Sequence, residues 1–309
     1  MRVFLAGATG VIGRPLVPQL IAAGHQVTGM TRSPEKTTAL QAAGAEAVVA
    51  DALDADAVMS AVEDARPEAV IHQLTAIPQR LDPRKLERDF ALNDRLRSEG
   101  TRHLVAAAQA SGATRILAQS IAFAYEPGPA GTVHDEDDPL IRQPPKQFRR
   151  SALALAELER TVLGAGGLVL RYGYFYGPHC GISETGAMRA DVLRRRLPIV
   201  GAGAGVWSFI HIDDAARATV AALTRGEPGP YNIVDDDPAP VSEWLPALAQ
   251  TLGAKPPRRV PALLARLLAG EYGVAVMTRA QGASNARARA ELSWTPRYPS
   301  WREGFAAAL

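Results

Sequence analysis

The sequence has one cysteine, Cys180, among its 309 residues, and only six histidines. A single cysteine excludes an internal disulfide framework and is typical of a reducing compartment, so we expect a cytoplasmic protein. The histidines and the cysteine never cluster with the spacing that a zinc site needs, so we expect no metal. Long hydrophobic runs are also missing, since none approaches the roughly 20 residues that span a bilayer.

A strong charge of either sign is absent as well. The chain carries 34 Lys and Arg against 32 Asp and Glu, a formal net charge of +2. This balance gives no reason to expect a nucleic-acid or membrane partner, and a small-molecule substrate is the simpler expectation. Met1 leads directly into the first apolar run, which leaves no room for a signal peptide.

The chain opens with an apolar run at residues 3–6 that leads into three glycines and then an apolar helical pattern. This order predicts a strand, a tight turn and a helix start, with glycines that allow the turn, the approach of a pyrophosphate and close helix–strand packing. Amides at the helix start would face the phosphates. The turn therefore predicts a dinucleotide site made by Gly7, Thr9, Gly10, Val11, Ile12, Gly13 and Arg14.

A second strand is expected at residues 25–30, followed by Thr31, Arg32 and Ser33. NAD-binding proteins usually carry Asp or Glu here to bind the ribose 2′-hydroxyl. A carboxylate would repel a 2′-phosphate, whereas the planar guanidinium of Arg32 can bind one, and Arg14 adds a second cation. We therefore expect NADP(H) rather than NAD. The alternative is that Arg32 is a solvated loop charge, as most arginines are.

Further strands are expected at residues 45–49, 69–74 and 115–119, with a long amphipathic helix over residues 84–111. Strands alternating with helices at this spacing predict a parallel, doubly wound sheet. The loops after the third and fourth strands add candidate cofactor contacts. Asp51 either accepts the adenine amino group or caps the helix that starts near Asp54. The remaining candidates are Ala52, Leu74 and Thr75.

Several segments together resemble the extended short-chain dehydrogenase/reductase superfamily, of the NAD-dependent epimerase/dehydratase type. They are Gly7-Ala-Thr-Gly10-Val-Ile-Gly13, Asp51-Ala-Leu-Asp54, Leu92-Asn93 with Gly100-Thr101, Leu170 to Pro178, Phe209 to Ala215, and Tyr231 to Val234. The resemblance implies a Rossmann-type α/β fold with a smaller C-terminal substrate-binding lid, a nicotinamide cofactor and a homodimer. We expect the nucleotide-binding domain at 1–171 plus 206–234, and the lid at 172–205 plus 235–309.

The standard catalytic residues of that superfamily are missing. Its members use Ser or Thr with Tyr-x-x-x-Lys, where tyrosine moves a proton and the ammonium lowers the tyrosine pKa. Here the serine position falls on Ile121, and the Tyr-x-x-x-Lys slot reads Phe148 to Ala152. Tyr-x-x-x-Lys occurs nowhere in the chain. The sequence therefore predicts an atypical member, with Tyr125 and Tyr174 as leading proton donors and Ser120 as a further candidate.

A second departure concerns the substrate. Nucleotide-sugar members place an Arg before the Phe-x-His segment, where this chain has Trp207. Losing that cation argues against a nucleotide-diphosphate substrate. Aromatic residues gather in loops at the expected carboxyl edge of the sheet, where ligands bind in such folds. An aromatic pocket of Phe123, Phe148, Tyr176 and Trp207 predicts a small, neutral, partly apolar substrate of aromatic or polyketide-like character.

Without the usual acid, a reductase would need an acceptor that requires less help, such as an enone, an imine or a quinone-like compound. We therefore expect an NADP-dependent oxidoreductase of secondary metabolism. Two alternatives remain open: a non-redox isomerase, dehydratase or cyclase, and a non-enzymatic NADP-responsive binding protein. Two aromatic residues are expected in structural roles. Phe175 should belong to the core of the small domain, and His211 should hold a loop by bonding Asp213 or a backbone group.

Overall fold

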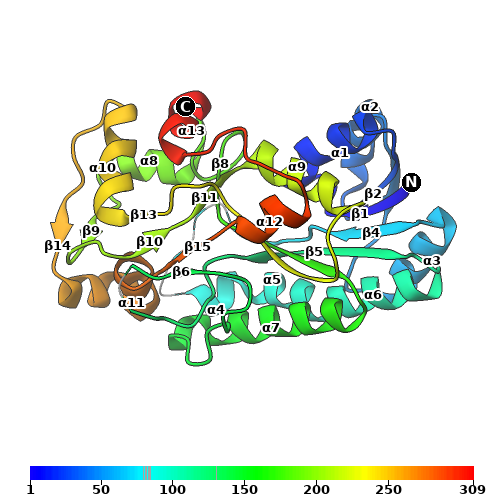
Figure 1. Ribbon diagram of the computed structural model, residues 1–309, viewed down its shortest axis with the longest axis horizontal. Helices are drawn as coiled ribbons and strands as arrows, with labels where there is room; N and C mark the ends of the chain where they lie inside the picture. Colours follow the sequence, from blue (N-terminus) through cyan, green and yellow to red (C-terminus); the bar gives the residue numbers. More distant parts are fainter. Residues whose placement is uncertain (79, 81, 83–84, 130) are drawn as a thin grey trace.

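The computed structural model describes residues 1–78, 80, 82, 85–129 and 131–309. Its centre is a seven-stranded parallel sheet in the order β12-β7-β5-β4-β1-β2-β3, which confirms the doubly wound α/β fold (Figure 1). The strands are β1 (Arg2–Ala6), β2 (Gln26–Thr31), β3 (Glu46–Val49), β4 (Ala69–His72), β5 (Arg115–Ile121), β7 (Leu168–Tyr172) and β12 (Gly229–Ile233).

Helices cover both faces of the sheet because its strands are apolar on both sides. One face packs against α1 (Gly13–Ala22), α9 (Ile212–Ala222) and α12 (Ala286–Glu291), while the other packs against α3 (Ala55–Ala65), α6 (Thr101–Ala110) and α7 (Arg149–Gly164) (Figure 1). The short α2 (Thr37–Ala42) follows a single turn at Pro34–Lys36. In β1, Val3 and Leu5 point to the first core cluster and Phe4 to the second, as period-two alternation requires.

The expected long helix over residues 84–111 is interrupted. Its described part consists of α4 (Leu86–Asp89), α5 (Ala91–Arg95), a π-helical turn at Leu96–Gly100, and α6. Residue 84 lies outside the described residues. A π turn inside a helix makes room for a local irregularity and often marks a functional region. Here the π turn carries buried Arg97 and packs against α7.

The C-terminal region forms the lid at one end of the sheet (Figure 1). It contains α8 (Ala187–Leu193), α10 (Val241–Thr251), α11 (Ala262–Thr278), α13 (Trp301–Ala308), β8 (Tyr174–Tyr176), β9 (Ile199–Val200), β10 (Val206–Trp207), β11 (Phe209–His211), β13 (Ala239–Pro240) and β14 (Arg259–Val260). A third core cluster, rich in tryptophan and phenylalanine, holds these elements together. The lid therefore has an apolar core of its own, as a separate folding layer needs.

Two features refine the expected division of the chain. The strands β10 and β11 contribute Trp207 and Phe209 to the lid core, whereas Ala288 and Leu292 around α12 pack into the first cluster of the sheet. A short parallel pair, β6 (Val133–His134) with β15 (Gly282–Ala283), links the loop after β5 to the segment after α11. The boundaries at 171, 205 and 235 stay a prediction.

Among the described helices, none has both the length and the apolar character to cross a bilayer. In the same part of the chain, His, Cys, Asp and Glu side chains do not gather in groups of three or more that could hold a metal ion.

Candidate functional site

The turn after β1 has the geometry that the glycine spacing predicts. Gly7 has φ 91°, which favours glycine, and a Cβ there would lie 2.6 Å from the carbonyl oxygen of Gln73. A Cβ at Gly13 would lie 2.3 Å from the carbonyl oxygen of Gly7, so α1 can pack this closely on the turn only with glycine. These two glycines shape the turn and the start of the helix.

Gly10 differs, because its outer face is open. A Cβ at Gly10 would meet a single atom within 4 Å, the Gly7 carbonyl oxygen at 3.1 Å. Within the described chain, the backbone N–H groups of Val11 and Ile12 have no hydrogen-bond acceptor. They stand at the positive end of the ten-residue helix α1, where phosphate oxygens are favoured. This turn fits a dinucleotide pyrophosphate.

The loop after β2 carries the residues expected to select the phosphorylated cofactor. Thr31 is buried, and its Oγ1 accepts a hydrogen bond from the Ser33 backbone N–H at 3.2 Å, which fixes the chain around Arg32. The Arg32 side chain is exposed and makes no ion pair with the described residues. Arg14 is also exposed on the glycine turn, and its Nε donates to the Thr9 carbonyl at 3.4 Å.

The loops after β3 and β4 complete the expected cofactor edge. Asp51 does not cap α3. Its Oδ1 accepts from the Leu53 N–H at 3.0 Å, whereas Asp54 caps the helix by accepting from the Ala57 N–H at 3.1 Å. The alternative of an adenine contact by Asp51 therefore remains. Beside it, Ala52 is buried, while Leu74 is half-buried and Thr75 is exposed in the loop after β4.

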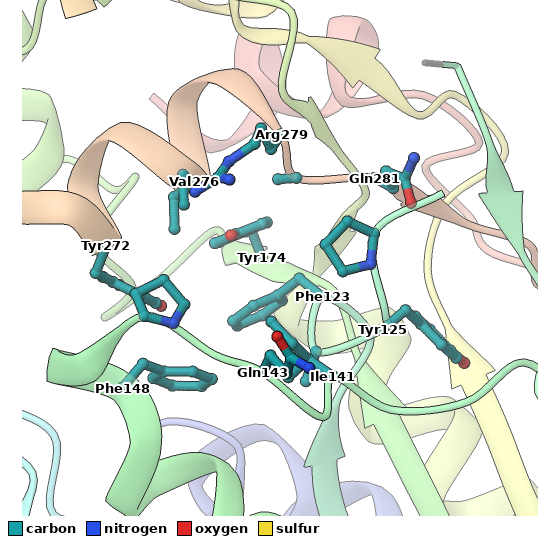
Figure 2. Close-up of a pocket in the computed structure, with 15 residues that line it drawn as sticks. Phe123, Tyr125, Ile141, Gln143, Phe148, Tyr174, Tyr272, Val276, Arg279 and Gln281 are labelled. Carbon is teal, nitrogen blue, oxygen red and sulfur yellow. The ribbon is translucent and has the colours of Figure 1, made fainter. Parts of the chain in front are cut away.

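A pocket of about 110 Å³ lies beyond β5 and β7 on the same carboxyl edge of the sheet (Figure 2). Its lining comes from the segment between β5 and α7, the start of β8, and the second half of α11 with the three residues that follow it. The described lining residues are Phe123, Ala124, Tyr125, Pro127, Ile141, Gln143, Pro145, Phe148, Tyr174, Tyr272, Ala275, Val276, Arg279, Ala280 and Gln281. The volume is of the same order as a cavity that holds one benzene ring.

Stacked aromatic rings form the walls of this pocket. The rings of Phe123 and Tyr174 stack with centroids 4.2 Å apart, and the other face of Tyr174 stacks on Trp207 at 3.8 Å. Across the pocket, Phe148 stacks on Tyr272 at 4.9 Å. Flat, rigid apolar walls of this kind suit a flat aromatic ligand.

Of the four residues expected to line the substrate pocket, the structure brings Phe123 and Phe148 to it and not the other two. Tyr176 is fully buried in the lid core, edge-on to Phe305 at 5.3 Å. Trp207 lies behind Tyr174, and its Nε1 donates to the Val276 carbonyl at 3.1 Å. Tyr176 follows the pocket residue Tyr174 by two positions on β8 but packs into the lid core, and the ring of Tyr174 separates Trp207 from the pocket.

The hydroxyl of Tyr125 is directed away from the pocket (Figure 2). It donates to Asn232 Oδ1 at 2.6 Å and accepts from Arg171 Nη1 at 2.9 Å. The ring forms part of the pocket wall, whereas burial raises the pKa of Tyr125 to about 12. The structure therefore does not place Tyr125 as a proton donor to a ligand in this pocket.

Ser120 belongs to the same buried network and not to the pocket. Its Oγ donates to Glu159 Oε1 at 2.6 Å, and Glu159 forms a two-bond ion pair with Arg171 at 3.0 and 2.7 Å. These three side chains are nearly inaccessible to solvent. The network joins β5, β7 and α7, so we assign Ser120 a structural role.

Tyr174 is the proposed proton donor that does reach the pocket. Its hydroxyl has no hydrogen-bond partner within the described part of the chain. Burial raises the Tyr174 pKa well above its ordinary value, with the nearby Tyr272 adding to the shift. A tyrosine with a raised pKa stays protonated and donates hydrogen bonds, but it transfers its proton less readily than a tyrosine beside a lysine.

Phe148 and Ala152 occupy the slot where the superfamily carries tyrosine and lysine. Phe148 stacks on Tyr272, and Ala152 is half-buried on α7. No lysine is found among the described residues that line the pocket. The π-helical turn carries another buried cation, Arg97, which interacts electrostatically with Asp94 and with the pocket residue Tyr272, and burial lowers the Arg97 pKa to about 10.

Sequence reasoning missed the contribution of α11. Tyr272, Val276 and Arg279 follow one another at a spacing of four and three residues, which places them on one face of a helix. This spacing is the signal in the sequence that indicates a shared face. Arg279 is the one charged side chain among the described lining residues.

One of two structural expectations is confirmed: His211 Nδ1 accepts from the Asp213 backbone N–H at 3.2 Å, which caps α9. Phe175 does not belong to the core of the small domain, because it packs, partly buried, against the first core cluster, that of the sheet. Burial lowers the pKa of His211. His211 is therefore a capping residue.

Comparison with known families settles the wider relationship. The model of the NAD dependent epimerase/dehydratase family matches residues 3–234, which includes the glycine turn and the whole sheet. The chain belongs to this family. A curated relative from a Streptomyces species, 3-diazoavenalumate denitrifying reductase, is 50% identical over 98% of this chain and 99% of its own length. The chain is thus an oxidoreductase-type enzyme of the family, and a nicotinamide dinucleotide is its cofactor class.

Solved structures of the family share the fold. UDP-glucose 4-epimerase of Thermotoga maritima with UDP-glucose superposes with a TM-score of 0.78 at 20% identity, over 100% of this chain and 97% of that one. A human epimerase family protein with NADPH superposes with a TM-score of 0.74 at 19% identity, over 100% and 99%. At this identity the likeness concerns the fold alone.

Proposed function

We propose that this chain is an NADPH-dependent reductase that transfers hydride to an electron-poor carbon of a small aromatic metabolite. The observation that carries the proposal is the pocket itself. Aromatic walls lie on the carboxyl edge of the sheet, the edge that also carries the turn that fits a pyrophosphate, and Phe148 and Ala152 stand where the superfamily has tyrosine and lysine.

The replaced residues define what kind of acceptor the site suits. Reducing a carbonyl needs a proton for the oxygen as well as a hydride for the carbon, and losing the acid forgoes roughly 10²–10⁴-fold in rate. The hydroxyl of Tyr125 is held in the buried network, and Tyr174 has a raised pKa. An acceptor that needs no proton therefore fits this site better than a ketone.

A diazo group on an aromatic carbon is such an acceptor. The bound nicotinamide would supply a hydride. A C–H bond forms, the C–N bond breaks, and its electron pair leaves with dinitrogen: R–N₂⁺ + H⁻ → R–H + N₂. The half-identical relative is named for a diazo compound that it reduces with loss of nitrogen, which supports this choice. Quinone-like acceptors, enones and imines also accept hydride at carbon, but their reduction takes up a proton as well, so they fit this site less well than a diazonium carbon.

The role of the protein is then to hold and orient the substrate. The ring pairs Phe123–Tyr174 and Phe148–Tyr272 confine a flat ring, and correct orientation alone can lower a barrier by several kcal/mol. The apolar lining also keeps water from the reacting carbon. The preference for NADPH rests on Arg32, an exposed cation in the loop where a 2′-phosphate would lie.

The test mixes purified protein with NADPH and a panel of aryl diazonium salts, quinones and enones. We expect loss of the nicotinamide absorbance, with one equivalent of dinitrogen released per NADPH from the diazonium salts. NADPH deuterated at the transferred position should place deuterium on the product ring, while the same reaction run in D₂O with ordinary NADPH should place none there.

The alternatives give different results. Conversion of a substrate without consumption of NADPH would point to an isomerase, dehydratase or cyclase. Tight NADPH binding with no consumption by any acceptor, together with a co-purifying protein, would point to a cofactor-responsive binding protein. Either result would overturn the proposal.

We further propose that the protein acts in the cytoplasm, in a pathway of secondary metabolism, as a homodimer. The single cysteine supports the first point, the aromatic pocket and the Streptomyces relative the second, and the family resemblance the third. Size-exclusion chromatography with light scattering tests the dimer.

A further inference from the structure

Arg279 is the one charged side chain among the described residues that line the pocket. It stands at the C-terminal end of α11, and it forms no ion pair or side-chain hydrogen bond with the described part of the chain. Figure 2 shows it on the same side of the pocket as Val276, opposite Phe148 and Gln143. A cation in an aromatic pocket without a carboxylate partner is available to an anion from outside.

Neutral hydrogen-bond donors also reach this pocket. Within the described part of the chain, the hydroxyls of Tyr272 and Tyr174 lack partners, and the Gln143 side chain is exposed at the rim. Burial raises the Tyr272 pKa to about 12, so this hydroxyl donates at neutral pH. A carboxylate has about four sites for accepted hydrogen bonds, and the guanidinium can fill two of them in parallel.

We propose that the substrate is an aromatic acid whose carboxylate binds Arg279 while its ring lies between the Phe123–Tyr174 and Phe148–Tyr272 pairs. This rests on the proposed reductase function and replaces the neutral substrate expected from the sequence. The relative that is 50% identical to this chain is named for 3-diazoavenalumate, and the ending of that name denotes the anion of an acid. An anionic substrate agrees with a cation in the pocket.

A cation at a helix C-terminus has another explanation, because it interacts favourably with the helix dipole. That role would affect stability alone and would not depend on the charge of a ligand. The two roles are therefore separated by comparing an acid with its uncharged amide, which has nearly the same shape.

The experiment measures binding of benzoate and cinnamate, each paired with its primary amide, to the protein–NADP⁺ complex by calorimetry. We expect wild type to prefer at least one acid over its amide by about 10- to 100-fold, the range of a charge-assisted hydrogen bond. Arg279→Gln should abolish the preference, whereas Arg279→Lys should retain part of it, since lysine keeps the charge but not the two-bond geometry.

Lys255→Gln is the matched control, because it removes one positive charge from an exposed lid residue outside the pocket lining. It should leave the preference unchanged. Equal binding of acids and amides to wild type, binding of neither, or an unchanged preference in Arg279→Gln would overturn the inference. Failure of the reductase function is seen separately, as absence of NADPH consumption with every acceptor, so the two failures are distinguishable.

Discussion

At the scale of single residues, hydrogen-bond partners decide which candidates can act on a ligand. Tyr125 and Tyr174 both border the pocket, and both were reasonable proton donors. The hydroxyl of Tyr125 is hydrogen-bonded to Arg171 and Asn232, while the hydroxyl of Tyr174 has no hydrogen-bond partner among the described residues. Chemically identical side chains therefore have different roles at neighbouring places.

Tyr125→Phe should leave the reductase rate within about twofold of wild type while lowering stability. The variant removes a buried hydroxyl that accepts from a guanidinium, and leaving one partner unsatisfied costs about 1–3 kcal/mol. This corresponds to a fall in Tm of roughly 2–12 °C for a chain of this size. Calorimetry and steady-state kinetics check the two parts, and a loss of rate at unchanged Tm would contradict the structural role.

Arg32→Asp should weaken NADPH binding by about 10- to 100-fold and leave NADH binding nearly unchanged. The reason is that the variant replaces a cation near the 2′-phosphate by an anion, and a charged hydrogen bond is worth about 1.5–3 kcal/mol. Fluorescence titration with both cofactors measures the effect, with NADH as the internal control. Equal weakening of the two cofactors would show that Arg32 does not select the phosphate.

At the scale of elements, local patterns predicted the strand–turn–helix unit well and the pocket helix poorly. The glycine turn is specified by sterics within a few residues, so Gly7, Gly10 and Gly13 could be assigned from their spacing. Tyr272 and Arg279 could not, because they reach the pocket only after α11 bends at Gly270, whose φ of 71° and ψ of −179° interrupt the helix. Local sequence patterns do not predict the direction in which a helix continues after such a bend.

Gly270→Ala should therefore disturb the substrate site more than the cofactor site. A non-glycine residue in this conformation costs about 1–3 kcal/mol, so the second half of α11 should shift or the kink should relax. We expect the substrate KM to rise several-fold and the NADPH dissociation constant to stay within about twofold, because the kink lies in the lid and not at the glycine turn. Titration with NADPH is the control, and weakened NADPH binding at unchanged KM would contradict this view.

At the scale of the whole molecule, the alternation of strands and helices predicted the sheet, because parallel strands need helical crossovers on both faces. The pocket depends instead on contacts between segments far apart in the chain, such as Phe148 with Tyr272 and Phe123 with Tyr174. Aromatic composition alone could not separate Phe148, which lines the pocket, from Tyr176, which fills the lid core. Distinguishing them needs the tertiary packing.

The folded protein should lose stability in acid because of His72, a buried residue at the end of β4 between the cofactor edge and α6. Its Nδ1 accepts from the Leu74 N–H at 3.1 Å, and its Nε2 lies 3.0 Å from Thr101 Oγ1. Burial lowers the His72 pKa from 6.5 to about 4, so the folded protein keeps this side chain neutral. The unfolded chain binds the proton first as the pH falls below 6.5, so this contribution to stability is present above pH 6.5 and is lost between pH 6.5 and 4. The loss is on the order of 2 kcal/mol at pH 5.

His72→Asn keeps an acceptor for Leu74 but cannot titrate. Between pH 7 and pH 5, the Tm of this variant should therefore fall by roughly 4–8 °C less than the Tm of wild type. An equal fall in both proteins would show that another group controls acid unfolding.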